Sequence, residues 1–172
     1  MTTLYQLTDF GVLRVAGSGN LALLQGQLTA DVSAIAKEGQ LAAHCLPNGR
    51  IISLFYLTQI EADFYCILPH DLLPIAQKAL LKYAPFFKAT LTDVSADWFV
   101  YGAVQPIKVP AAATISLPHQ QAQLLLSNTS LPSASDTQNT WHAIEMRAGI
   151  ARLSAATSGL FLPHELRLPQ LN

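Results

Sequence analysis

The sequence contains few charged residues. Asp, Glu, Lys and Arg together make up 12% of its 172 residues, whereas an ordinary globular chain has roughly 25%. Apolar residues reach 51%, and the mean hydropathy is +0.30. A self-contained domain usually carries a more polar surface. We therefore expect part of the apolar surface to be covered by a further domain or a partner, including a second copy of the chain.

The chain also lacks the features of nucleic-acid-binding, membrane and secreted proteins. Its net charge is −1, so direct binding to nucleic acid or to anionic membranes, which requires a basic surface, is not expected. No run approaches the ~18 apolar residues of a membrane span, and the N-terminal residues do not resemble a signal peptide. Its cysteines, Cys45 and Cys66, lack CxxC spacing, which predicts reduced thiols in the cytoplasm.

Motifs for nucleotide binding and nucleophilic hydrolysis are absent as well. The sequence has no Gly-x-Gly-x-x-Gly run, no phosphate-binding loop and no Ser-His-Asp elbow. His142 and Glu145 stand three positions apart on an expected helix, which resembles half of a helical-bundle metal site. No second half exists, and the other histidines share no ligand spacing. We therefore predict no metal site and no catalytic residues.

Hydrophobic patterns predict an α+β fold with antiparallel sheets and packed helices. In the first helix, Leu21, Leu24 and Leu28 recur at helical spacing and are expected to form the buried stripe. Gly49 is expected in a turn, and Gly149 is expected to end the last helix. Strands are expected at residues 11–17, 40–45, 51–56, 63–68, 89–94, 98–104 and 122–127, and helices at 21–28, from 70–71 onward and at 140–148.

Four segments, taken in order, carry a family resemblance. Residues 24–32 read Leu-Gln-Gly-Gln-Leu-Thr-Ala-Asp-Val, and 44–50 read His-Cys-Leu-Pro-Asn-Gly-Arg. Residues 82–88 read Lys-Tyr-Ala-Pro-Phe-Phe-Lys, and 158–166 read Ser-Gly-Leu-Phe-Leu-Pro-His-Glu-Leu. Together they resemble the YgfZ-type folate-binding proteins, which are relatives of the glycine-cleavage T-protein, an aminomethyltransferase. The family's most distinctive motif, Lys-Gly-Cys-Tyr-x-Gly-Gln-Glu, does not occur in the sequence.

The resemblance implies the ferredoxin-like units of the T-protein fold. Residues 1–172 then correspond to the N-terminal folate-binding region, and the usual C-terminal barrel domain is absent. Two intertwined subdomains are expected, one of about residues 1–45 with 140–172 and one of about residues 46–139.

The cluster at residues 25–31 has two interpretations. Under the resemblance, the side chains of Gln25, Gln27, Thr29 and Asp31 form a wall of a pterin pocket, since the ring offers donors and acceptors to amides and carboxylates. Alternatively, the cluster ends the first helix, with the hydroxyl and the carboxylate capping the next turn.

Two arginines are further folate candidates. Arg50 follows a Pro-Asn-Gly turn and suits a carboxylate of the folate tail, or is simply solvated. Arg147 replaces the acid that usually precedes Ala-Gly in the family, and that acid helps T-proteins bind folate. The reversed charge predicts weak tetrahydrofolate binding, unless Arg147 turns to the glutamate tail or pairs with Asp31 or Glu145.

The resemblance implies a non-enzymatic folate-binding factor that supports assembly or repair of iron–sulfur clusters and tRNA modification. Its partners are then folate and iron–sulfur enzymes or their assembly factors. One alternative is a tetrahydrofolate-dependent aminomethyltransferase. A second is a truncated remnant without a ligand, which Arg147 and the missing cysteine motif favour.

Overall fold

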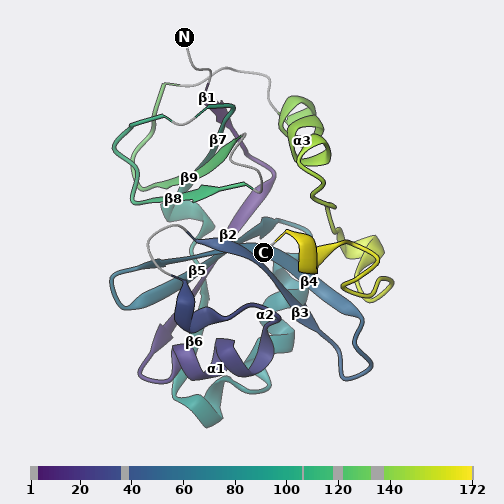
Figure 1. Cartoon of the computed structure of the whole chain (residues 1–172). Coiled ribbons are helices and arrows are strands. Elements are labelled where there is room, and N and C mark those ends of the chain that lie inside the picture. Colours follow the sequence, from purple (N-terminus) through teal and green to yellow (C-terminus); the bar gives the residue numbers. More distant parts are fainter. Residues whose placement is uncertain (1–3, 36–38, 106, 118–121, 133–137, 172) are drawn as a thin grey trace.

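The computed structural model shows an α+β chain with two antiparallel sheets (Figure 1). It describes residues 4–35, 39–105, 107–117, 122–132 and 138–171. The five-stranded sheet has the order β3-β4-β5-β2-β6, and the four-stranded sheet has the order β1-β7-β9-β8. The strands are β1 (Leu4–Gln6), β2 (Phe10–Gly17), β3 (Gln40–Cys45), β4 (Ile51–Ile60), β5 (Asp63–Pro69), β6 (Ala89–Asp93), β7 (Phe99–Ala103), β8 (Ala113–Ser116) and β9 (Gln123–Ser127). The α-helices are α1 (Asn20–Gln27), α2 (Leu73–Leu81) and α3 (Gln138–Arg147).

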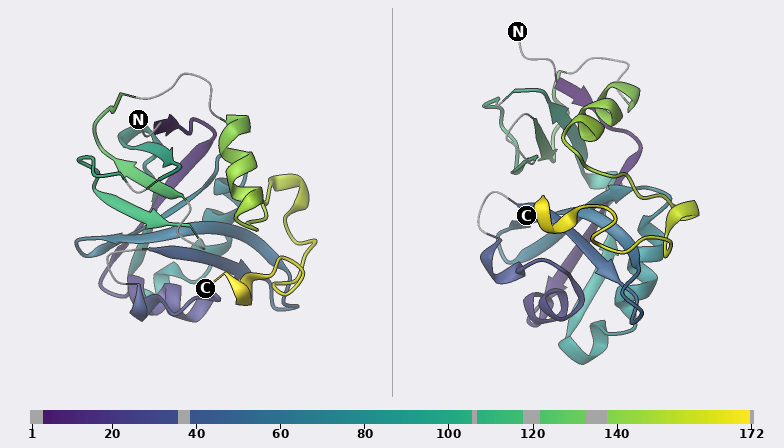
Figure 2. Two further views of the ribbon diagram at one scale, coloured as in Figure 1. Left: turned by 45° about the horizontal axis from the view of Figure 1, so that its top comes forward. Right: turned by 45° about the vertical axis from the view of Figure 1, so that its right-hand side comes forward.

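The five-stranded sheet is the middle layer of the molecule. Its strand β4 is buried from Ile51 to Thr58 and β5 from Phe64 to Leu68, and strands buried on both faces need cover on both. Helices α1 and α2 contact this sheet and lie below it, whereas the four-stranded sheet and α3 lie above it (Figures 1 and 2). No helix in the described part of the chain is long and apolar enough to cross a membrane.

Helix α3 is attached to the four-stranded sheet through Trp141. The indole is fully buried and lies against the backbone of β7, where an ideal Cβ at Gly102 would be 2.2 Å from Trp141 Cε3. Only glycine fits there, because any side chain would overlap the ring. This contact holds α3 above the five-stranded sheet.

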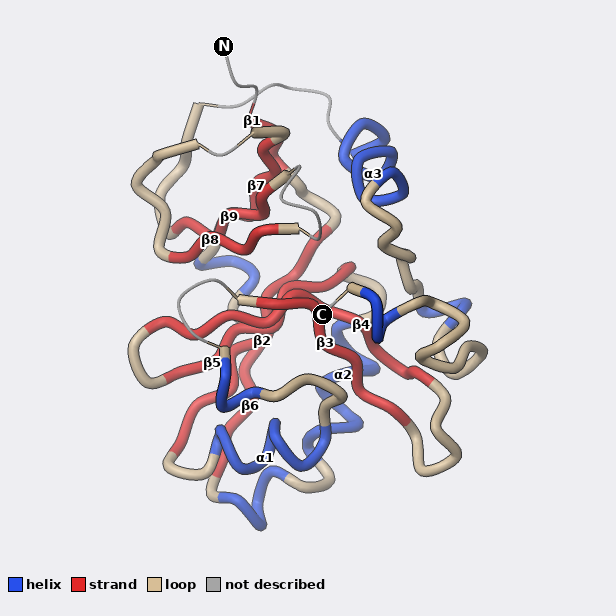
Figure 3. Tube along the Cα trace, viewed as in Figure 1, coloured by secondary structure: helices blue, strands red, loops and turns tan. Residues whose placement is uncertain are grey.

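The segment that follows α3 contains no strand in its described residues, 148–171 (Figure 3). It is tied to the start of β4, since Ile51 N donates to Phe161 O at 2.8 Å and Gly159 N donates to Ile51 O at 2.8 Å. Ser158 Oγ also donates to Ile52 O at 2.7 Å. The motif at residues 158–166 therefore packs beside the β3–β4 hairpin.

The fold class and the order of the expected strands and helices are confirmed, with ends shifted by a few residues. Gly49 has a φ of +83° and Gly149 has a φ of +76°, so both glycines lie in the left-handed region where L side chains are strained. Two short strands, β1 and β8, were not predicted. The division into two intertwined subdomains stays a prediction.

One local prediction, that Leu21 belongs to the buried stripe of the first helix, is wrong. Leu21 is 43% exposed, and the buried residues of α1 include Leu23 and Leu24. The buried face of α1 is formed by Asn20, Leu23 and Leu24, which leaves Leu21 outside it, and Leu28 lies beyond the helix with an extended backbone, φ −103° and ψ 158°. Helix α2 has Leu72 as its N-cap, without a side-chain hydrogen bond, and Oδ2 of the preceding Asp71 accepts from Ala155 N at 2.9 Å.

Candidate functional site

An open cleft of about 500 Å³ lies above one end of the five-stranded sheet, and we call it the junction cleft. Phe10 of β2 pairs with Pro69 of β5, so the residues just before β2 and just after β5 meet at this end. Helix α3 and the segment after it complete the walls. The volume is within the ~300–1,000 Å³ of small-molecule sites. The lining residues are Asp9, Pro69, His70, Asp71, His142, Arg152, Leu153 and Ser154.

Arg152 links the walls of the junction cleft. Its Nη2 donates to Asp9 Oδ2, its Nη1 lies 3.5 Å from His142 Nδ1, and its guanidinium carbon lies 4.9 Å from the centroid of the Phe10 ring. The ion pair is only partly exposed, with side-chain exposures of 19% for Arg152 and 28% for Asp9. A guanidinium that is both paired and stacked on an aromatic face is well positioned.

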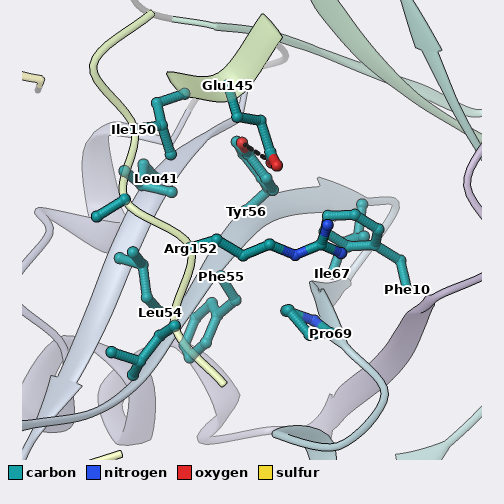
Figure 4. Close-up of a pocket in the computed structure, with 12 residues that line it drawn as sticks. Phe10, Leu41, Leu54, Phe55, Tyr56, Ile67, Pro69, Glu145, Ile150 and Arg152 are labelled. Carbon is teal, nitrogen blue, oxygen red and sulfur yellow. Dashed lines mark hydrogen bonds between the residues drawn. The ribbon is translucent and has the colours of Figure 1, made fainter. Parts of the chain in front are cut away.

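Behind Arg152 lies a smaller cavity of about 20 Å³, which we call the inner pocket (Figure 4). Glu145 and Tyr56 are its buried polar residues, and Tyr56 Oη donates to Glu145 Oε1 at 2.7 Å. Glu145 is 3% exposed, and the Trp141 side chain is a second hydrogen-bonding neighbour of its carboxyl group. The inner pocket is lined by Phe10, Leu41, Leu54, Phe55, Tyr56, Ile67, Pro69, Glu145, Ile150, Ala151, Arg152 and Leu153.

The surroundings of this pair favour the neutral carboxyl group. Burial raises the pKa of Glu145, while the hydrogen bond from Tyr56 and the charge of Arg152 oppose the shift. Burial, followed by the charge of Glu145, raises the pKa of Tyr56 well above its ordinary value. The ionisation of the carboxyl group in the inner pocket therefore depends on its burial, on the hydrogen bond from Tyr56 and on the charge of Arg152.

The predicted folate residues at 25–31 make local contacts beside the edge strand β3. Gln25 Oε1 accepts from Val32 N at 2.7 Å and from Ser33 N at 3.2 Å. Asp31 Oδ1 accepts from Ser33 Oγ at 2.6 Å, and this bond lowers the pKa of Asp31. Thr29 Oγ1 accepts from Ala43 N at 3.2 Å.

The other predicted folate residues lie at the ends of α1 and α3 and in the β3–β4 hairpin. Gln27 is half-buried at the end of α1. Arg50 lies in the β3–β4 hairpin and donates through Nη1 to Leu160 O. Arg147 is the exposed last residue of α3, while Glu145 is bonded to Tyr56. Among the described residues that line the junction cleft and the inner pocket, none belongs to the predicted set of Gln25, Gln27, Thr29, Asp31, Arg50 and Arg147.

No metal cluster accompanies these sites. Within the described ranges, no group of three or more His, Cys, Asp and Glu side chains is arranged to hold a metal ion. Cys45 is half-buried and Cys66 is buried, and both are free thiols. Burial raises the pKa of each thiol, which makes both poor nucleophiles.

Sequence reasoning missed Asp9, Tyr56 and Arg152. Tyr56 lies in an apolar strand and resembles an ordinary core residue, and the other two lie in loops. The available signal was the spacing of His142 and Glu145, because residues three apart share a helix face. That face is the one that α3 turns toward the junction cleft and the inner pocket.

Comparisons with known proteins agree with the fold. No family model matches the chain. An uncharacterized protein of Haemophilus influenzae is 31% identical over 172 residues, which cover 98% of this chain and 61% of that protein. The tRNA-modifying protein YgfZ of Colwellia psychrerythraea is 24% identical over 202 residues, which cover 99% and 62%. The chain thus spans about three fifths of the length of the curated relatives that it matches.

The solved structure of glycine cleavage system aminomethyltransferase T from Bartonella henselae matches with a TM-score of 0.58. The match has 10% sequence identity and covers 86% of this chain and 45% of that protein, so it bears on the fold alone. Sequence similarity along nearly the whole chain and this shared fold agree: the chain is distantly similar to the YgfZ proteins and shares the fold of the T-protein.

Proposed function

We propose that the chain is the N-terminal, folate-binding part of a non-enzymatic cytoplasmic factor that supports assembly or repair of iron–sulfur clusters. Its client enzymes then include one that modifies tRNA, so that its effect on tRNA is indirect. The proposal rests on one observation above all. Similarity to proteins named tRNA-modifying protein YgfZ extends over 98–99% of the chain.

The size and the polar lining of the junction cleft support the proposal that it binds a folate-sized ligand. Folate presents an aminopyrimidinone ring with N–H donors at one end and carboxylates at the other. Asp9 Oδ1 is buried without a partner among the described residues, and Arg152 is the cation of the cleft. An unpaired carboxylate oxygen beside a guanidinium suits a ligand that carries both donors and acceptors.

Calorimetric titration of the chain with tetrahydrofolate tests the proposal. We expect weak binding, with a dissociation constant in the micromolar range or above, because this chain has an arginine at position 147, where the family usually has an acidic residue. We expect no aminomethyl transfer by the same preparation. No binding at millimolar tetrahydrofolate would overturn the proposal.

Arg147→Glu is the comparison for position 147. Stronger binding by this variant would place the pterin ring at the end of α3. Weaker binding would assign Arg147 to the carboxylates of the folate tail. Alanine substitution of Gln25, Gln27, Thr29, Asp31 and Arg50, one at a time, tests the other predicted contacts.

The iron–sulfur role has a separate test in cells. In bacteria that lack their own YgfZ-type gene, expression of this chain should raise the activity of the iron–sulfur enzyme that modifies tRNA. An activity that stays at the level of the empty vector would contradict this role for the chain.

A further inference from the structure

The motif at residues 82–88 lies outside both cavities. None of its residues lines the junction cleft or the inner pocket. It continues from the end of α2 into a short 3-10 helix, η2 (Ala84–Phe87). This helix contacts α1 at the lower end of the molecule (Figure 1). The proposed folate function therefore gives the segment no role.

Apolar side chains project into solvent along this segment. The side chain of Phe86 is 84% exposed, and large parts of Leu81 and Tyr83 are exposed before it. Phe86 N donates to Tyr83 O at 3.0 Å, so these two aromatic residues belong to one tight turn. Contact of such side chains with water is unfavourable. We use the name lower surface for the exposed side chains of Lys78, Leu81, Lys82, Tyr83, Phe86 and Lys88.

The charges of this segment are all positive. Residues 72–92 contain three lysines and no Asp or Glu, and the neighbouring helix α1 contains no charged residue. This stretch therefore carries a charge of +3, and since the whole chain carries −1, the remainder carries −4. The charge is unevenly distributed, so the expectation drawn from the net charge does not apply to the lower surface.

The chemistry of the lower surface fits an anionic lipid bilayer better than a protein partner. Protein interfaces are enriched in Arg and depleted in Lys, and the guanidinium fork of Arg suits carboxylates, whereas every cation here is a lysine. A lysine buries its methylene stem along apolar surface while its ammonium group stays at the level of polar groups. Aromatic and leucine side chains between lysines are typical of proteins that lie on a membrane surface.

We propose that the lower surface is a peripheral docking site for an anionic lipid bilayer. The ring of Phe86 enters the boundary between headgroups and acyl chains, and the ammonium groups of Lys82 and Lys88 contact lipid phosphates. This site is separate from the junction cleft, so it goes beyond the proposed folate function and does not depend on it. Insertion of Phe86 into a bilayer and pairing of two copies through Phe86 exclude each other, so lipid competes with self-association.

Co-sedimentation with lipid vesicles tests the docking site. The full chain, kept dilute, is mixed with vesicles of equal parts phosphatidylglycerol and phosphatidylcholine, with vesicles of phosphatidylcholine alone, and with buffer. Phe86→Asp removes the ring, and Lys88→Gln removes one exposed charge. Lys108→Gln, at an exposed position between β7 and β8, is the matched control. Thermal unfolding checks that each variant is folded.

We expect wild type to bind the anionic vesicles more tightly than the neutral ones, and salt to weaken this binding. Phe86→Asp should weaken it by at least about tenfold, because one large apolar side chain no longer leaves water. Lys88→Gln should weaken it by about fivefold, and Lys108→Gln should bind as wild type does. Lipids brominated in their acyl chains should quench the fluorescence of Phe86→Trp more than that of wild type.

Three results would overturn the inference. The first is sedimentation that is the same with anionic vesicles and with buffer. The second is vesicle binding that Phe86→Asp leaves unchanged. The third is binding of polyglutamate, but not of vesicles, that Phe86→Asp abolishes, which would assign the lower surface to an acidic protein.

Discussion

The Tyr56 hydroxyl and the Glu145 carboxyl group form a buried hydrogen bond of 2.7 Å between β4 and α3, across 89 positions of sequence. The bond connects the five-stranded sheet to the helix that covers its upper side. It also places a titratable group in an apolar pocket. The stability of the fold should therefore depend on the ionisation of Glu145.

Glu145→Gln should change how stability varies with pH. Burial raises the pKa of Glu145 above its ordinary value of 4.5, so the folded state holds this proton more tightly than the unfolded state. Glu145 therefore lowers the free energy of unfolding at pH values above its raised pKa, and this destabilisation disappears as the pH falls to 4.5. Denaturant unfolding from pH 4.5 to 8 should show a smaller loss of stability toward high pH in Glu145→Gln. Glu61→Gln, at an exposed site, is the control, and identical profiles for both variants would contradict the prediction.

His44 should affect stability in the opposite direction. Burial, and then the charge of Lys82, lowers its pKa from 6.5 to about 4, and its Nδ1 has no partner among the described residues. Between pH 6.5 and 4, the unfolded state therefore binds a proton at His44 that the folded state does not bind. Stability should fall as pH decreases through this window, by at most about 3 kcal/mol for the shift from 6.5 to about 4.

His44→Leu separates this effect from that of Glu145. The variant should lose less stability than wild type between pH 6.5 and 4 in denaturant unfolding. His164→Gln, at an exposed position, is the matched control. A slope in His44→Leu as steep as that of wild type would show that His44 is not the group responsible.

Two glycines should respond in opposite ways to alanine. Gly102→Ala places a Cβ 2.2 Å from Trp141 Cε3, and such overpacking should destabilise the protein by about 2–3 kcal/mol. Gly26 lies in α1 with nothing within 4 Å of an ideal Cβ. Gly26→Ala should therefore stabilise the protein by roughly 0.5–1 kcal/mol through helix propensity. Thermal unfolding measures both changes, and a stable Gly102→Ala variant would contradict the close packing of α3 on β7.

The strands that were predicted correctly each have a local sequence pattern that is typical of a strand. Runs such as Ile51–Ile60 and Asp63–Pro69 are apolar and bounded by turn residues, so local pattern determines them. β1 was missed because the three residues Leu4–Gln6 are too few to show a period, and their strand conformation depends on pairing with β7. Leu21 was placed in the core by its spacing to Leu24 and Leu28, but the buried face of α1 is formed by Asn20, Leu23 and Leu24, and the helix ends before Leu28.

The candidate site could be predicted only in part. His142 and Glu145 share a helix face, which sequence spacing shows. Their neighbours come from distant segments. Asp9 meets Arg152 across 143 positions, a pairing that only the tertiary fold produces. The resemblance pointed to the YgfZ proteins, but which face of α3 turns inward had to come from the structure.

The exposed aromatic residue Phe86 predicts self-association. Phe86 is 84% exposed, and Leu81 and Tyr83 beside it are 46% and 38% exposed. Burial of one large apolar side chain contributes about 1.5–3 kcal/mol, so removal of Phe86 from an interface should weaken association by at least about tenfold. Light scattering over a concentration series should show dimers or larger species for wild type and a shift toward monomer for Phe86→Asp. Leu160→Asp, at an exposed position near the C-terminus, is the control for added charge. If wild type stays monomeric at the highest concentration, or if both variants dissociate alike, this surface does not pair copies of the chain.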